Sequence, residues 1–184
     1  MVAADRFLAK DYVRAKELFE SLAAGNYRPA QTLLGLMYAR GIGIDKDLSK
    51  ATTLIKAAAE GGDRLAAYLA GLAYLAGQGV DKNDSEAFRW SKVAADAGLQ
   101  EAFGSLAVLY FTGRGTPKDI GRAHQLATIA AGLGVVDGML VLGMMHEQGN
   151  GVAKDLTLAR QWYQRAADLN SPSGKAALQR LAGS

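Results

Sequence analysis

A short glycine motif recurs along the chain at a constant spacing of 36 residues. Two glycines separated by one residue occur at Gly41 and Gly43, Gly77 and Gly79, Gly113 and Gly115, and Gly149 and Gly151. A fixed period of roughly 20 to 50 residues is typical of stacked repeat architectures, in which each repeat packs mainly on its neighbours. This period constrains the fold more than any other feature of the sequence.

Two further columns of the repeat mark the ends of a helix. One column holds Asp or Asn, whose side chains accept hydrogen bonds from free backbone N–H groups where a helix begins. Its members are Asp11, Asp47, Asn83, Asp119 and Asp155. The other column holds Gly or Asn, the residues that most easily take the left-handed conformation ending a helix. Its members are Asn26, Gly62, Gly98, Gly134 and Asn170.

Each repeat is therefore predicted to contain two helices. The first helix lies between the Gly/Asn column and the glycine pair, and the second helix begins at the Asp/Asn column. Small residues recur inside the first helix, at Gly35, Gly71, Ala107 and Gly143. Glycine inside a helix costs about 1 kcal/mol relative to alanine, so this column predicts close approach of a neighbouring helix.

The glycine pair itself has two interpretations. A phosphate-binding glycine loop follows a strand and occurs once, whereas this pair follows a helix and occurs four times. The pair is therefore predicted to form the turn between two antiparallel helices.

The segment LLGLMYARGIGIDKDLSKATTLIKAAAEGG carries nearly all positions of a pattern that resembles the Sel-one-like repeat, a relative of the tetratricopeptide repeat. The resemblance runs from about residue 5 to the end of the chain. Departures from the pattern occur at Leu54 and Leu126 in place of tryptophan, at His146 in place of tyrosine, and at Ala107 in place of glycine. The resemblance implies an all-α, right-handed α-α superhelix, or solenoid, of 36-residue helical hairpins that serves as a scaffold for protein partners.

The whole chain is predicted to be a single solenoid. A half-repeat spans residues 1–26, repeats span about 27–62, 63–98, 99–134 and 135–170, and a capping helix spans 171–184. Lys175, Gln179 and Arg180 are expected to face solvent on that last helix.

Composition narrows the function classes. The 21 basic and 18 acidic residues are scattered and give a net charge of +3, so the basic stripe usual in nucleic-acid binding is missing. No apolar run reaches the roughly 18 residues of a membrane span, so membrane insertion is not expected. Zero cysteines exclude disulfides and thiolate chemistry. The chain opens on a lone second helix, which resembles the start of a mature exported bacterial member. A periplasmic location is therefore predicted, with a cytoplasmic location as the alternative.

The sequence predicts no catalytic residue, cofactor or metal site. His124 and His146 lie in different repeats and different helix types, which argues against a shared metal. Ser-x-x-Lys, the nucleophile pattern of penicillin-binding enzymes, is missing, and Thr53 to Lys56 is its nearest approach. Acidic residues near the turns are interpreted as helix caps and not as calcium ligands.

The first helices are nearly free of charge, and in solenoids of this type they line the concave surface. Resemblance to tetratricopeptide grooves predicts partner-binding residues at Arg40, Tyr68, Leu72, Leu75, Val108, Phe111, Leu140, Met144 and Glu147. About half of this apolar stripe is expected to belong to the core between repeats. Truncation of Tyr68 or Phe111 to alanine is expected to weaken partner binding with little loss of stability.

The function predicted from these residues is a non-catalytic scaffold that binds another protein, such as an effector, an enzyme or a complex subunit, in an apolar groove. One alternative is an immunity or inhibitor protein that neutralises a bacterial toxin such as a secreted lipase effector. A second alternative is a weak hydrolase of cell-wall or β-lactam substrates. Self-association through the solenoid ends is also considered, because the ends expose half-satisfied packing surfaces.

Overall fold

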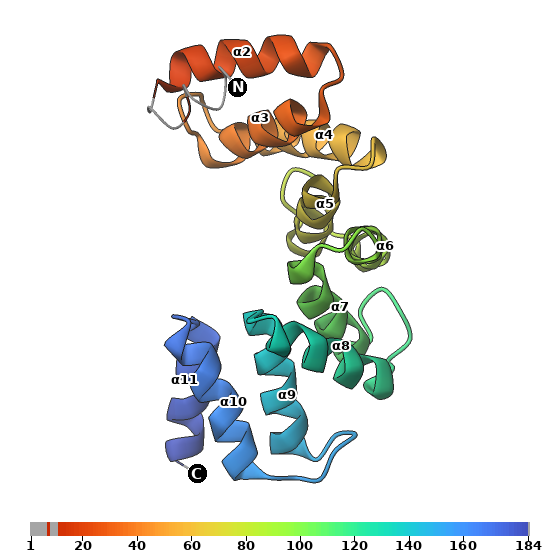
Figure 1. Ribbon diagram of the computed structural model, residues 1–184, viewed down its shortest axis with the longest axis vertical. Helices are drawn as coiled ribbons and strands as arrows, with labels where there is room; N and C mark the ends of the chain where they lie inside the picture. Colours follow the sequence, from red (N-terminus) through yellow and green to blue (C-terminus); the bar gives the residue numbers. More distant parts are fainter. Residues whose placement is uncertain (1–6, 8–10, 184) are drawn as a thin grey trace. The chain divides into compact units, whose positions relative to one another are not determined.

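The computed structural model describes residue 7 and residues 11–183 of the chain, and the elements within this part are α-helices (Figure 1). The chain divides into two compact units, unit 1 at Met1–Ala97 and unit 2 at Gly98–Ser184. The helices of unit 1 are α2 (Tyr12–Ala24), α3 (Arg28–Arg40), α4 (Leu48–Glu60), α5 (Arg64–Ala76) and α6 (Asp84–Asp96). The helices of unit 2 are α7 (Gln100–Thr112), α8 (Ile120–Gly132), α9 (Val136–Gln148), α10 (Leu156–Asp168) and α11 (Pro172–Ala182).

The predicted N-cap residues are confirmed at the second helix of each hairpin, which is α2, α4, α6, α8 or α10. The side chain of Asp47 accepts from the backbone N–H of Lys50 at 2.9 Å, and Asp119 accepts from Arg122 at 2.9 Å. Asp11, Asn83 and Asp155 cap α2, α6 and α10 in the same way. Each cap satisfies one of the backbone donors that a helix leaves free at its first turn.

The predicted stop signals are also confirmed. The Gly/Asn column has positive φ in all five members, including the two non-glycine residues Asn26 at 59° and Asn170 at 61°. Asparagine tolerates this left-handed region better than most residues with a Cβ atom. The turn between the second helix of one hairpin and the first helix of the next therefore follows from a Gly or Asn at one repeat position.

The glycine pairs form turns, as predicted. Gly41 and Gly43 have φ of 68° and 66°, and the other three pairs lie in the same left-handed region. The end of the turn is hydrogen-bonded to the preceding helix, because the backbone N–H of Asp47 donates to the carbonyl of Tyr38 at 3.0 Å. The equivalent bond to the carbonyl of His146 in the last turn is 2.9 Å long.

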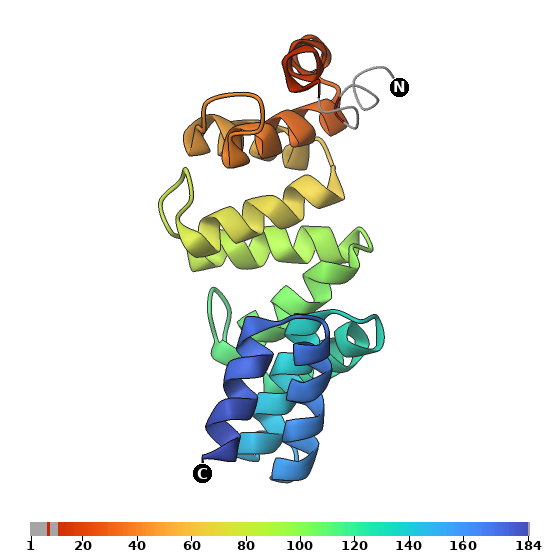
Figure 2. The same ribbon diagram turned by 90° about the vertical axis from the view of Figure 1, so that its left-hand side faces the viewer.

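In unit 1, consecutive helices pack in order from α2 to α6, so that one hairpin lies on the next (Figure 2). The core at the α2 end gathers Phe19, Leu34 and Met37 with several alanines. Gly35 lies where a Cβ atom would be 2.8 Å from the side chain of Ile55, which explains the small column on the first helix.

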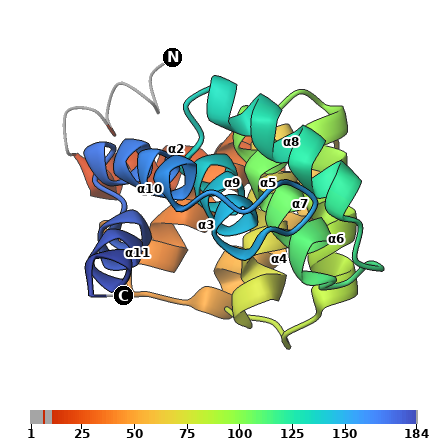
Figure 3. The same cartoon turned by 90° about the horizontal axis from the view of Figure 1, so that it is seen from below.

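In unit 2, consecutive helices pack in order from α7 to α11, and α10 contacts both α9 and α11 (Figure 3). Helix α7 also packs directly against α9. Tyr163 is 1% exposed at the centre of the α10–α11 core, and a Cβ atom at Gly143 would lie 2.5 Å from its ring. The predicted all-α class of stacked helical hairpins is confirmed.

Candidate partner-binding site

Helix α5 of unit 1 carries a row of leucine side chains along one face. Leu65, Leu69 and Leu72 follow one another at intervals of four and three residues, which places them on the same side of a helix. Leu65 is 41% exposed and Leu72 is 38% exposed, whereas Leu69 is half-buried. Unit 1 therefore presents an apolar helix face at its surface.

A cavity of about 220 Å³ lies beside this face, between α3, α4 and α5. We call it the unit 1 groove, and its lining residues are Ala39, Arg40, Leu48, Ala51, Thr52, Ile55, Leu69, Leu72, Ala73 and Gln78. Arg40 is the only charged residue among these ten. The hydroxyl of Thr52 donates to the backbone carbonyl of Gln78 at 2.9 Å, so this polar group is satisfied inside the wall.

Two of the residues predicted from the sequence, Arg40 and Leu72, line this groove. Arg40 is the last residue of α3 and is exposed. Tyr68 and Leu75 lie on α5 and are half-buried. In unit 1 the structure therefore brings an exposed leucine of α5 and the exposed arginine at the end of α3 into the lining of one groove.

The predicted partner-binding residues of unit 2 lie in different surroundings from those of unit 1. Phe111 is only 7% exposed, so the expectation that its side chain is available at the surface is wrong. Helix α7 packs against both α8 and α9, and an all-round apolar helix in that setting is buried on most sides. Leu140 and Met144 are half-buried and pack against the core formed by Tyr163 and Leu181. Val108 is half-buried in α7.

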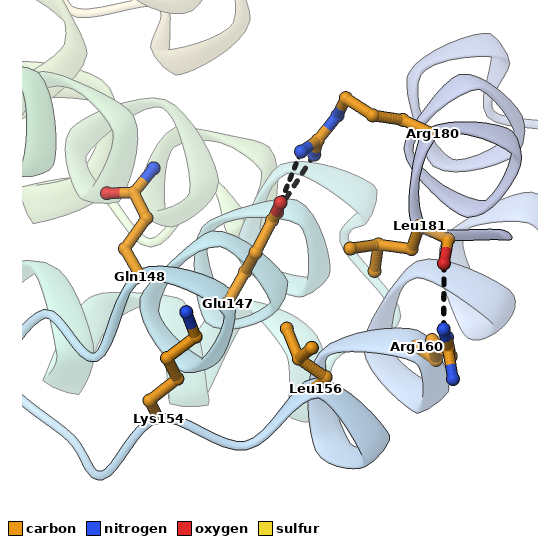
Figure 4. A pocket seen from close by; sticks show the side chains of 7 residues that line it. All are labelled: Glu147, Gln148, Lys154, Leu156, Arg160, Arg180 and Leu181. Atoms are coloured by element: carbon orange, nitrogen blue, oxygen red, sulfur yellow. Dashed lines mark hydrogen bonds and ion pairs between the residues drawn. The ribbon is translucent and has the colours of Figure 1, made fainter. Parts of the chain in front are cut away.

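Glu147 lies at the end of α9, and its carboxylate is occupied (Figure 4). The hydroxyl of Tyr163 donates to it at 2.7 Å, and Arg180 of α11 pairs with both of its oxygens through two nitrogens. The hydrogen bond from Arg180 lowers the pKa of Glu147. Burial, followed by the hydrogen bond to Glu147, raises the pKa of Tyr163. This network ties the last helix to α9 and α10.

The same end of unit 2 contains a cavity of about 710 Å³ (Figure 4). We call it the unit 2 cavity, and its lining residues are Glu147, Gln148, Lys154, Leu156, Arg160, Arg180 and Leu181. Arg160 donates to the backbone carbonyl of Leu181 at 2.7 Å. Three basic side chains and one acidic side chain line this cavity, in contrast to the largely apolar unit 1 groove.

Thr53 and His146, which were considered for catalytic or metal-binding roles, contact backbone groups near them in the sequence. The hydroxyl of Thr53 donates to the backbone carbonyl of Ser49 at 2.9 Å. Nδ1 of His146 lies 3.4 Å from the carbonyl oxygen of Ala153. Within residues 11–183 and residue 7, no group of three or more His, Cys, Asp or Glu side chains is arranged to hold a metal ion.

Second helices and loops also contribute to the walls of these cavities, and these residues were not predicted from the sequence. Leu48 and Thr52 of α4 line the unit 1 groove, and Leu156 and Arg160 of α10 line the unit 2 cavity. The repeat contains a signal that finds them, because Leu48 and Thr52 are each 108 residues, or three repeats, before Leu156 and Arg160. The two cavities therefore occupy equivalent positions in two different repeats.

A family model described as the Sel1 repeat matches residues 5–27, 28–63, 64–99, 105–135 and 136–171. The chain belongs to the Sel1 repeat family. Repeats of the Sel1 type typically mediate protein interactions. None of the curated proteins matches the chain.

Three solved structures from bacteria are similar to this Sel1 repeat chain. A Sel1 repeat protein from Oxalobacter formigenes is 31% identical with a TM-score of 0.78, and the match covers 96% of this chain and 73% of that chain. A protective antigen of uropathogenic Escherichia coli with an SLR fold is 34% identical with a TM-score of 0.74. That match covers 84% of this chain and 33% of the antigen. An immunity protein from Pseudomonas aeruginosa is 21% identical with a TM-score of 0.57, covering 88% of this chain and 60% of that chain. This last likeness concerns the fold alone.

Membrane insertion was not expected from the sequence. Among the helices of the described residues, none combines the length and the apolar character that crossing a membrane requires.

Proposed function

We propose that this Sel1 repeat protein is a non-catalytic binding module that holds a protein partner in the unit 1 groove. The observation that carries the proposal is the leucine row on α5, in which Leu72 is exposed and lines the groove together with Arg40. The groove accounts for two of the nine residues predicted from the sequence.

The apolar row has a free-energy cost that a partner removes. Complete burial of a leucine side chain contributes about 1.5–3 kcal/mol, and the exposed fractions of Leu65 and Leu72 leave part of this contribution unused. A partner side chain seated between α3 and α5 recovers it. Contiguous exposed apolar surface on a soluble protein commonly marks an interaction site.

The charge at the rim adds orientation. Arg40 is exposed at the mouth of the groove and offers a planar set of donors to a carboxylate or backbone carbonyl of the partner. The segment that fits best combines an apolar anchor, placed against Leu69 and Leu72, with an acceptor group near Arg40. A short helix or an extended segment meets both requirements.

The test compares two leucines with nearly equal exposure. Leu72→Gln removes the apolar anchor in the groove, and Leu158→Gln changes a 37% exposed leucine on α10. Both tagged variants and the parent protein are used to capture partners from native lysate, followed by mass spectrometry and measurement of Kd for the captured protein. We expect Leu72→Gln to weaken binding roughly tenfold at unchanged melting temperature, and Leu158→Gln to have no effect. Equal binding by all three proteins would contradict the proposed groove.

Two narrower proposals are tested with the captured partner. An immunity role requires the partner to be a toxic enzyme, such as a lipase effector, that loses activity in the complex. The support for this role is the fold shared with an immunity protein. A periplasmic location is proposed from the resemblance to exported bacterial members and is tested by cell fractionation.

Self-association through the ends is opposed by one residue at the C-terminal end. Gln179 of α11 stands in the column where Gly35, Gly71 and Gly143 allow a second helix to pack closely. Gln179 is exposed, and its side chain obstructs a helix from a second copy at this position. We therefore place the partner in the unit 1 groove and not at this end.

A further inference from the structure

Within each unit, the second glycine of the glycine pair lies against the first residue of an earlier second helix. A Cβ atom at Gly79 would lie 2.0 Å from the carbonyl oxygen of Leu48, and one at Gly151 would lie 2.3 Å from Cγ2 of Ile120. In unit 1 the same turn also provides the carbonyl of Gln78 to the hydroxyl of Thr52. In both units the start of a second helix is therefore a seat for a tight backbone turn, and in unit 1 that turn also supplies a carbonyl oxygen.

The start of α10 has the same seat with different surroundings. Leu156 stands in the repeat position of Leu48 and is 40% exposed. The unit 2 cavity of about 710 Å³ lies at this seat, compared with about 220 Å³ for the unit 1 groove.

The side chains around the start of α10 are cationic, whereas the equivalent side chains of unit 1 are a hydroxyl donor and an apolar group. Arg160 replaces the equivalent Thr52, and Arg180 replaces the equivalent Leu72. Lys154 adds a third positive charge, and Glu147 is the one negative charge, so the lining carries three minus one, a formal charge of +2. The negative charge is already satisfied by Arg180 and Tyr163.

Donors remain available at the seat. Arg160 is exposed and uses one nitrogen to bind the carbonyl of Leu181, whereas a guanidinium group has five N–H donors. Lys154 is exposed, and its ammonium group lies on the same side of the loop as Glu147 (Figure 4). The apolar side chains of Leu156 and Leu181 complete the lining.

We infer that the unit 2 cavity is a second interaction site, which binds an acidic segment of a protein through carboxylates on Lys154 and Arg160. The aliphatic parts of the segment's side chains lie on the exposed Leu156, and its carbonyl and carboxylate oxygens take the place that the carbonyl of Gln78 has in unit 1. Guanidinium groups match carboxylates in a planar, two-bond geometry, which favours this occupant over an apolar one. The inference is independent of the unit 1 groove, because it depends on residues of unit 2 alone.

The experiment uses the full chain and a fluorescein-labelled hexaglutamate peptide, with hexaglutamine as the neutral peptide, in fluorescence anisotropy. The double variant Lys154→Gln with Arg160→Gln removes two positive charges at the cavity. The matched double variant Lys46→Gln with Lys82→Gln removes two positive charges from the same loop column in unit 1. We expect the cavity variant to bind hexaglutamate about fivefold more weakly, the matched variant to bind within about twofold of the parent, and hexaglutamine not to bind.

Because Arg160 also holds the end of α11, Lys154→Gln alone is measured as well; it leaves that contact intact and is expected to weaken binding in the same direction. Equal weakening by both double variants would overturn the inference, as would the lack of saturable binding to the parent chain. Displacement of hexaglutamate by inorganic phosphate at equal charge concentration would also overturn it, because the site would then select charge and not a peptide segment.

Discussion

Unit 1 and unit 2 are built from the same repeat, but their first helices pack differently. In unit 2, α7 lies directly against α9, whereas α3 and α5 of unit 1, both fully described, make no comparable contact. The unit 1 groove lies between α3, α4 and α5. The same repeat therefore brings the two first helices α7 and α9 into contact in unit 2 and leaves α3 and α5 without a comparable contact in unit 1.

Gly104 of α7 explains much of the difference. It occupies the position held by Thr32 and Tyr68 in unit 1. A Cβ atom at Gly104 would lie 2.8 Å from Cγ1 of Val135 and 2.9 Å from Cβ of Asp137, so its missing side chain lets the start of α9 approach α7.

The largest expected effect comes from giving unit 2 the residue of unit 1. Gly104→Thr forces α7 and α9 apart, and we expect unit 2 to lose about 1–3 kcal/mol of unfolding free energy. Urea unfolding is followed by the fluorescence of Trp162 in a Trp90→Phe background, because each unit contains one of the two tryptophans. Gly121→Thr, at an exposed position of α8, is the control, since a Cβ atom there would lie 3.6 Å from its nearest neighbouring atom. Equal losses from both changes would break the comparison.

A smaller effect is expected at Glu147, where unit 1 has Ala39. Glu147→Gln weakens the bonds from Tyr163 and Arg180, and we expect a loss of about 1 kcal/mol in unit 2 at neutral pH. The pKa of Glu147 is lowered in the folded chain, so its contribution is present above its ordinary pKa and is lost as pH falls through the lowered value.

The loss from Glu147→Gln should therefore shrink in acid when urea titrations are compared across pH. Asp168→Asn, an exposed change on α10, is the control and should show no such trend. A constant loss at every pH would mean that packing, and not charge, connects Glu147 to α11.

The smallest effect is expected at Asp137, which occupies the position of the exposed Leu65 of unit 1. Burial raises the pKa of Asp137, so the folded chain takes up a proton at higher pH than the unfolded chain does. Its stability cost is present above the raised pKa and disappears as pH falls toward the ordinary value. Asp137→Asn is expected to stabilise unit 2 by less than about 1 kcal/mol at neutral pH.

Differential scanning calorimetry at neutral and acidic pH measures this gain. Glu101→Gln is the control, because Glu101 is exposed at the same repeat position on α7. A loss of stability from Asp137→Asn would show that the first turn of α9 benefits from the charge more than burial penalises it.

The sequence was sufficient for the elements whose cause is local. Asp47 caps a helix by accepting from the backbone N–H three residues later, and Asn170 ends a helix by taking a positive φ. Single residues therefore predict both the start and the end of a helix. It was not sufficient for contacts between repeats. Phe111 was expected in a groove because its helix is apolar all round, and only the packing of α7 on α9 shows that it is buried.

The candidate site was predictable in part for the same reason. Leu72 and Arg40 lie on first helices, which were expected to face a partner, and both line the unit 1 groove. Thr52 and Arg160 come from second helices, and their roles depend on what packs against them: the turn at Gln78 for Thr52 and helix α11 at Leu181 for Arg160. That information lies in the relation between repeats and not in the pattern within one repeat.

The central claim is that the repeat position occupied by Leu72 serves binding in unit 1, whereas the same position serves packing at Met144 of unit 2, and cysteine labelling tests it most directly. The chain has no cysteine, so Leu72→Cys and Met144→Cys, at the same repeat position, each introduce a single thiol. Labelling rates with a maleimide reagent are measured with and without the captured partner. We expect Leu72→Cys to react faster than Met144→Cys and to be protected by the partner. A partner that slows Met144→Cys and leaves Leu72→Cys unchanged would contradict the assignment of the binding site to unit 1.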